Sequence, residues 1–111
     1  MAIRHIVLCR FRADVPDAER QAIFDQLADL SGHLAGILDM RFGASVSPEG
    51  LEQGFGHGFT IDFADVAARD AYLVDAAHQA AGGRLVAACE GGVAGLVVID
   101  LELDLERDIM D

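Results

Sequence analysis

The chain opens with alternating apolar and polar side chains, a pattern typical of a β-strand with one face on a core. Residues 3–12 read IRHIVLCRFR. The two-residue period of a strand places five side chains on one face: Ile3, His5, Val7, Cys9 and Phe11. The opposite face carries Ile6 and Leu8 in its middle and arginines toward its ends. Both faces in the middle of this predicted strand are therefore expected to be buried.

A helix is predicted after the first strand. Apolar residues recur there at steps of three and four and form one stripe: Ile23, Leu27, Leu30 and Leu34, with Phe24 beside them. Asp14 or Asp17 is expected to cap its start, and Gly32 and Gly36 bracket its end.

Two further alternating segments predict strands at 38–46 and 57–63, separated by a polar loop that runs to Gly56. The first is expected to place Leu38, Met40, Phe42 and Ala44 on one side. The second is expected to do the same for His57, Phe59, Ile61 and Phe63.

A second helical segment is predicted from a cap at Asp65 through Tyr72 and His78 to Cys89. The pairs Gly82-Gly83 and Gly91-Gly92 are interpreted as helix breaks that let this segment bend over a pocket. A last strand is expected over 93–103, followed by an acidic tail from about residue 104 that is frayed or laid against a partner. The order β-α-β-β-α-β predicts one α+β domain over residues 1–111 with a ferredoxin-like fold.

Three segments in one order resemble the stress-responsive dimeric α/β-barrel (Dabb) family. They are the opening IRHIVLxxF, the stretch Gly43-x-x-x-Ser47-Pro48-Glu49-Gly50, and Tyr72-x-x-x-x-Ala77-His78-Gln79. The resemblance implies a ferredoxin-like fold whose open sheet face pairs with a second copy to form a dimeric α/β barrel. It also implies a link to stress response.

One plant branch of that family is a polyketide cyclase that closes a ring by aldol-type chemistry with histidine and tyrosine side chains. The matching positions here are Tyr72 and His78, with His5 and His57 as further polar candidates. The chain departs from the family where a proline often precedes the histidine, since it has Asp75-Ala76-Ala77 there. It also has Leu27 near the place of an aromatic hydroxyl in the cyclase branch.

Charge and composition exclude several classes of protein. The 111 residues include 8 basic side chains, all of them Arg, and 19 acidic ones, so the net charge is −11. An acidic chain lacks the basic footprint that nucleic acid requires. A hydrophobic content of 52% is too high for a disordered chain. The longest apolar run, near Val93–Ile99, is too short for a membrane span, and no signal-peptide pattern opens the chain, so a cytoplasmic protein is expected.

Histidine and tyrosine supply the candidate chemistry. A histidine accepts a proton near neutral pH, and a protonated tyrosine donates a hydrogen bond to a developing enolate oxygen. On an unbroken helix, six residues turn through about 600°, which leaves Tyr72 and His78 roughly 120° apart. The two can share a cavity only if the helix is interrupted between them. The alternative is that Tyr72 packs its ring on the core with its hydroxyl at the surface.

The other polar candidates also have structural alternatives. His5 and His57 lie on apolar strand faces near strand ends, where each is either a site residue or simply solvated or satisfied by a hydrogen bond. Cys9 and Cys89 are far apart in sequence and are interpreted as buried, reduced thiols. Without an H-x-x-x-H or H-x-H pair, no metal and no cofactor is expected.

Two functions follow from these observations. The first is a homodimeric, stress-associated protein without enzymatic activity that binds a small hydrophobic or aromatic ligand between sheet and helices, beside His5, His57, Phe24 and Phe59. The alternative is a polyketide-cyclase-like lyase with His78 as general base and Tyr72 as hydrogen-bond donor. The homodimer is expected to bury Ile6, Leu8 and part of Leu96–Ile99. Its expected polar rim is Arg4, Arg10, Arg12, Asp62 and Asp100.

Overall fold

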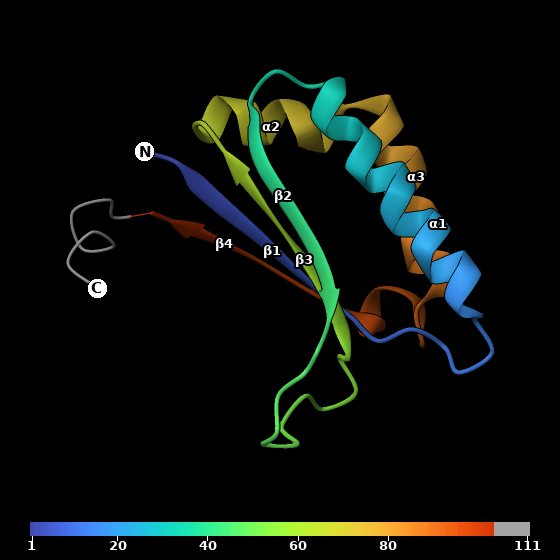
Figure 1. Cartoon of the computed structure of the whole chain (residues 1–111). Helices are drawn as coiled ribbons and strands as arrows, with labels where there is room; N and C mark the ends of the chain where they lie inside the picture. The colour runs from blue at the N-terminus through green and yellow to red at the C-terminus, as the bar shows by residue number, and fades with distance from the viewer. Residues whose placement is uncertain (104–111) are drawn as a thin grey trace.

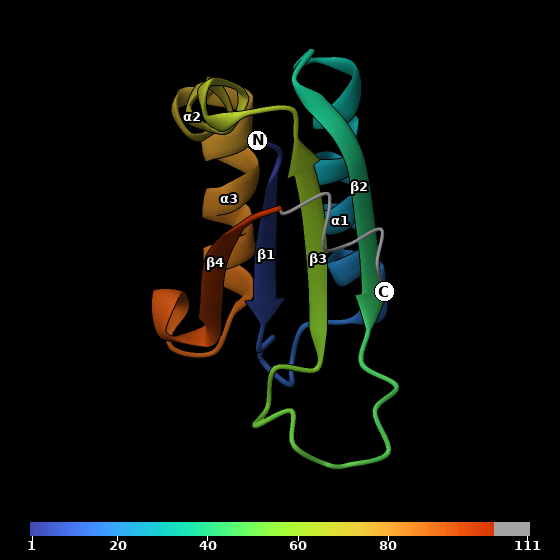
Figure 2. The same cartoon turned by 90° about the vertical axis from the view of Figure 1, so that its left-hand side faces the viewer.

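A four-stranded antiparallel sheet with helices on one face forms the protein, in a computed structural model that describes residues 1–103 (Figures 1 and 2). The elements in chain order are β1 (Ile3–Cys9), α1 (Asp17–Ala28), the 3₁₀-helix η1 (Asp29–Gly32), β2 (Ile37–Ala44), β3 (His57–Phe63), α2 (Val66–Val74), α3 (Ala76–Ala88), the 3₁₀-helix η2 (Gly92–Gly95) and β4 (Leu96–Glu102). The strand order is β2-β3-β1-β4. The predicted ferredoxin-like α+β fold is confirmed. The predicted acidic tail from about residue 104 lies outside the described residues.

The alternation predicted for β1 sets the two faces of the sheet. Ile3, His5, Val7 and Cys9 are all buried against the helices, and Leu8 on the opposite face is partly exposed. In the β1–β3 register, His5 lies opposite Ile61 and Val7 opposite Phe59, so β3 adds its buried side chains to the same core. Figure 1 shows α1 and α3 on this side of the sheet, and within residues 1–103 no helix covers the other side. We call this uncovered surface the open face.

The prediction for Leu38 is wrong, because β2 contains a register shift. Ile37 pairs with Phe63 and Asp39 with Asp62, so the strand has one extra residue between them. This bulge turns Leu38 outward, where it is 64% exposed, and gives its place toward the core to Ile37. Met40 and Phe42 pack against the core as predicted.

Several predicted boundaries are corrected at the helix ends. Pro16 occupies the N-cap position of α1 without a side-chain hydrogen bond, so neither Asp14 nor Asp17 caps the helix. Asp65 does cap α2, because its carboxylate accepts a hydrogen bond from the Ala68 N–H at 2.8 Å. The last strand begins at Leu96 rather than at residue 93, because η2 occupies residues 92–95.

The predicted break at Gly82-Gly83 is also wrong, since α3 runs without interruption from Ala76 to Ala88. The long helical segment is interrupted at Asp75 instead. Gly91 and Gly92 follow α3 with positive φ angles of 73° and 67°, a conformation that glycine adopts without steric cost. Over the described part of the chain, no helix combines the length and apolar character that crossing a membrane requires.

Candidate functional site

A cavity of about 330 Å³ lies between the sheet and the helices α2 and α3. Most of its wall is apolar, and the polar groups come from one strand and from the two helix ends that meet at Asp75. The residues that line it are His5, Val7, Leu27, Phe59, Tyr72, Leu73, His78, Gln79, Gly82, Leu85, Val86, Leu96 and Val98. Four of the six residues that the sequence proposed for the site therefore surround one cavity: His5, Phe59, Tyr72 and His78.

The break at Asp75 brings Tyr72 and His78 together. Asp75 is extended, with φ −70° and ψ 133°, so Tyr72 lies in the last turn of α2 and His78 in the first turn of α3. The two rings are 3.9 Å apart between centroids and inclined by 34°. The interruption that the sequence required for a shared cavity is present, although no proline makes it. Tyr72 is only 1% exposed, so the alternative with its hydroxyl at the surface is wrong.

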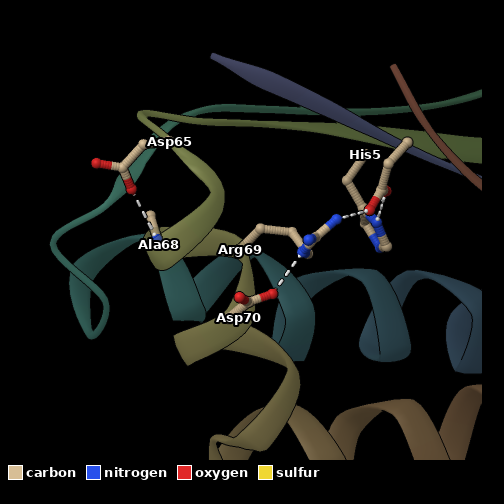
Figure 3. A network of polar contacts seen from close by, with 6 residues as sticks. His5, Asp65, Ala68, Arg69 and Asp70 are labelled. Carbon is tan, nitrogen blue, oxygen red and sulfur yellow. Dashed lines mark hydrogen bonds and ion pairs between the residues drawn. The ribbon is translucent and has the colours of Figure 1, made fainter. Parts of the chain in front are cut away.

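His5 is held by a chain of charged partners that the sequence did not reveal. Its Nδ1 lies 2.7 Å from Asp100 Oδ1, and Arg69 Nη1 donates to Asp100 Oδ2 at 2.7 Å. Figure 3 shows this arrangement, in which Arg69 of α2 also donates to Asp70 at 2.8 Å. A carboxylate at Nδ1 favours the tautomer that keeps a proton there and leaves Nε2 as the acceptor. The His5 ring packs against the Tyr72 ring at 5.7 Å between centroids.

The contact between His5 and Asp100 shows that the predicted polar rim of the open face is partly wrong. His5 and Asp100 are paired in the β1–β4 register, so both side chains lie on the helix-covered face. Arg12 donates to the Ala87 carbonyl near the end of α3. Neither Asp100 nor Arg12 therefore frames the open face. Arg4 and Asp62 do lie there and form an ion pair with each other at 2.8 Å.

Burial sets the protonation of the two stacked rings. It raises the pKa of the Tyr72 hydroxyl, so the phenol stays protonated and can donate a hydrogen bond. Burial, and then the nearby His5, lower the pKa of His78, which is therefore neutral at neutral pH. The backbone carbonyls of Leu73 and Tyr72 and the carboxylate of Asp75 oppose this shift in part. His78 Nδ1 is buried and makes no hydrogen bond with any described residue.

His57 and Phe24 lie elsewhere, beside a second cavity of about 310 Å³ that α1 forms with β2 and the start of β3. A row of aromatic rings connects His57 to the wall of the first cavity. Between centroids, His57 lies 5.3 Å from Phe11, Phe11 lies 5.8 Å from Phe24, and Phe24 lies 6.0 Å from Phe59, which lines that cavity. Burial and the charge of Arg20 lower the pKa of His57. The structure therefore does not bring His57 and Phe24 to Tyr72 and His78.

The remaining candidate chemistry is limited. Cys9 and Cys89 are both buried free thiols, and burial raises the pKa of Cys9 to about 12, which keeps it protonated. In the part of the chain that the structure describes, no three His, Cys, Asp or Glu side chains are arranged to hold a metal ion. Among the six residues that the sequence proposed for the site, two histidines and the tyrosine are the polar groups that the first cavity brings together.

Comparisons with known proteins agree with the fold and the sequence motifs. The model of the Stress responsive A/B Barrel Domain family, Dabb, matches residues 3–103. A dimeric ferredoxin-like protein of unknown function from Jannaschia sp. CCS1 is 33% identical, with a TM-score of 0.87 over 93% of this chain and 100% of that one. The hydroxynitrile lyase of Passiflora edulis has the same fold at 20% identity, with a TM-score of 0.83 over 93% of this chain and 94% of that one. Olivetolic acid cyclase of Cannabis sativa is 23% identical over 78 residues, 70% of this chain and 77% of that protein.

Proposed function

The chain belongs to the stress responsive A/B barrel domain family, and on that premise we propose that it is a homodimer that binds a small hydrophobic or aromatic carbonyl compound. The observation that carries this proposal is the cavity of about 330 Å³ in which His5, Tyr72 and His78 converge among apolar side chains. Ligand sites of proteins are commonly of this kind, with an apolar wall and a few placed polar groups.

The polar groups define the class of ligand. Of the described residues that line the cavity, His5, Tyr72 and His78 are the only titratable ones, so no arginine neutralises an anionic ligand there. Tyr72 is a neutral donor because burial raises its pKa. A carbonyl oxygen is the acceptor that fits such a donor, and the apolar wall fits the rest of an uncharged ligand.

The homodimer is proposed from the open face. Ile6 and Leu8 of β1 lie opposite Ile99 and Val97 of β4, and Leu8, Val97 and Ile99 are 38%, 37% and 48% exposed. Ile6 and Leu8 also line a hollow of about 490 Å³ that β1, β2 and β3 form with the loop 45–56. A contiguous apolar surface of this kind is typical of an interaction site, and the relative from Jannaschia sp. CCS1 is dimeric.

Ligand binding can be tested by thermal denaturation with a panel of neutral aromatic ketones and β-diketones. We expect at least one of them to raise the melting temperature with a saturable dose dependence. Gly82 lines the cavity and Gly83, its neighbour, is exposed with open space around it, so the two offer a matched pair. Gly82→Leu should fill the cavity and abolish the shift, and Gly83→Leu should retain it. Equal shifts in both variants would place the ligand elsewhere, and the absence of any shift would contradict the proposal.

A lyase is the second candidate, favoured by the 3.9 Å stack of Tyr72 on His78. Neutral His78 would accept the proton from a carbon next to the ligand's carbonyl, and the C–H electron pair would form an enolate. The Tyr72 hydroxyl would donate a hydrogen bond to the enolate oxygen. The enolate carbon would then attack a second carbonyl of the same molecule, and the proton held by His78 would pass to the new alkoxide. The step closes a ring without an oxidant or reductant.

The proton transfer can be measured without knowing the natural substrate. We expect the protein to accelerate exchange of the acidic C–H of a bound β-diketone with deuterium, followed by NMR. His78→Ala should lower the rate by about 10²–10⁴ with the fold retained, because a positioned base contributes that much. Tyr72→Phe should cost a smaller factor. Retained exchange in His78→Ala would assign the base to another group, and no exchange in the wild type would leave binding as the function.

A further inference from the structure

Asp75 is the single residue between α2 and α3, and both of its carboxylate oxygens are used. Oδ2 accepts from the backbone N–H of His78 at 3.0 Å, and Oδ1 lies 2.9 Å from His33 Nε2. The backbone of Asp75 is bonded as well: its N–H donates to the Tyr72 carbonyl at 3.2 Å, and its carbonyl accepts from the Gln79 N–H at 3.0 Å. Three of these four partners line the cavity.

The sequence around Asp75 offers no other cause for the break. Ala76 and Ala77 are the best of helix formers, and no proline or glycine lies between Val66 and Ala81. A helix that continued through this segment would leave Tyr72 and His78 roughly 120° apart around one axis. An aspartate at the N-cap favours a new helix start instead, since it satisfies an N–H that has no partner within the helix.

His33 holds that carboxylate from outside the helix pair. It follows η1, in the connection between α1 and β2, and its side chain is about half exposed whereas that of Asp75 is only 16% exposed. The hydrogen bonds from the His78 N–H and from His33 lower the pKa of Asp75, so the carboxylate is ionised at neutral pH. His33 thus ties a third segment of the chain to the junction that carries the site.

We propose that Asp75, held by His33, is a positioning residue that ends α2, starts α3 and thereby sets His78 against Tyr72. The expectation that Asp75 raises ligand affinity rests on the proposed function. The expectation that Asp75 sets the position of the His78 ring does not, because that position is a property of the protein without ligand. The two can therefore be tested separately.

The first test reads the His78 ring by NMR in the free protein. A ring stacked at 3.9 Å on an aromatic neighbour carries a large ring-current shift, and its pKa is lowered by burial. In Asp75→Ala we expect that shift to collapse and the pKa of His78 to return toward its ordinary value. Asp65→Ala is the matched control, since Asp65 caps α2 through an equivalent bond to Ala68. It should lower the melting temperature comparably and leave the His78 signals unchanged.

A proline at position 76 should restore the break between α2 and α3 that the Asp75 carboxylate provides. Ala76 is the first residue of α3, where proline is favoured, and the ψ of 133° at Asp75 suits a residue that precedes proline. In the double variant Asp75→Ala/Ala76→Pro we expect the ring-current shift of His78 to return. If Asp75→Ala does not fold, Asp75→Asn and Asp75→Glu decide the question. Asparagine caps well and should keep the wild-type His78 signals, whereas glutamate caps poorly and should lose them.

Ligand affinity supplies the second test. For a ketone that shifts the wild-type melting temperature, the Kd should rise about tenfold in Asp75→Ala and recover in the proline double variant. His33→Ala should give a smaller rise, because the bond to His78 N–H remains. Wild-type His78 signals in Asp75→Ala, or equal signals in the Asn and Glu variants, would overturn the positioning role. Failure of every ketone to bind, with the NMR result as expected, would overturn only the proposed function.

Discussion

At the scale of residues, the two histidines of the cavity, one buried and one partly buried, are accommodated in opposite ways. His5 is 5% exposed and has a carboxylate partner in Asp100, which is itself held by Arg69. His78 shares the cavity but its Nδ1 has no hydrogen bond from the described residues. A buried polar atom without a partner costs free energy, so it persists only where something else sustains it. For His78 that support is the cap at Asp75 and the stack on Tyr72.

The lowered pKa of His78 predicts a pH dependence of stability. Its pKa in the folded protein lies below the ordinary value of about 6.5 that it has when unfolded. Between these two values the unfolded chain binds more protons, so the free energy of unfolding falls as the pH falls through about 6.5. The shift at His57 acts in the same direction. We expect the melting temperature to decrease from pH 8 to pH 5 at constant ionic strength.

A variant isolates the contribution of His78. His78→Gln does not titrate, so its melting temperature should decrease less over the same range than that of the wild type. The lowered pKa values of Asp75 and Asp100 act at lower pH, because carboxyl groups begin from about 4. His5, Tyr72 and Asp75 are the titratable groups that face His78, and all three are retained in this variant, where Asp75 still accepts from the backbone N–H of residue 78. Identical slopes for the two proteins would show that His78 is not buried as described.

The sequence identified the residue types of the site but not all of their partners. His5, Tyr72 and His78 were identified from the resemblance to the family and from the chemistry of histidine and tyrosine, although the spacing of Tyr72 and His78 on an unbroken helix opposed a shared site. Asp100 was missed as the partner of His5 because the two residues are 95 positions apart in the chain and their contact depends on the register between β1 and β4. The register of β1 on β4 places His5 directly opposite Asp100, so the pairing follows once that register is known.

At the scale of elements, both the strand and the helical apolar periods predicted buried faces, and the errors lie at a bulge and at a helix boundary. The alternation of β1 and β3 gave the buried faces correctly, because one face of each strand rests on a continuous core. It failed where a bulge changes the period, at Leu38. The helical segment was misread at Gly82-Gly83 because glycine lowers helix propensity without ending a helix. A capping side chain at Asp75 ended one instead.

The junction between the first helix and β2 leads to a prediction at Gly36. A Cβ added there would lie 2.3 Å from the Cβ of Ala68, so β2 and α2 approach each other more closely than a side chain permits. Gly36→Ala should push α2 away and lower the free energy of unfolding by about 1–3 kcal/mol. Gly32→Ala is the control, since nothing lies within 4 Å of a Cβ there. Urea denaturation of both measures the difference, and equal midpoints would contradict the close approach.

At the scale of the whole molecule, charge and apolar surface act against each other. A net charge of −11 on each chain repels a second copy. At about 0.1 M salt the Debye length is near 10 Å, so much of that repulsion is screened. In the proposed dimer the open face supplies the attraction, because burying apolar surface is worth about 25 cal/mol per Å². Arg4 and Asp62 lie beside it as an ion pair, so this part of the face contributes little net charge. Dimerisation should therefore strengthen as salt is raised from low concentration.

The dimer itself is tested at Leu8, which lies on the open face of the inner strand β1 and is 38% exposed. Wild-type protein at micromolar concentration should sediment with twice the chain mass of 11.8 kDa. Leu8→Glu places an uncompensated carboxylate on each side of a two-fold interface, so it should weaken the dimer by at least about 100-fold. Val66→Glu introduces the same charge at the exposed first residue of α2, in the helix layer, and should leave the dimer intact. A wild-type monomer, or equal weakening by both variants, would contradict the assignment of the open face as the interface.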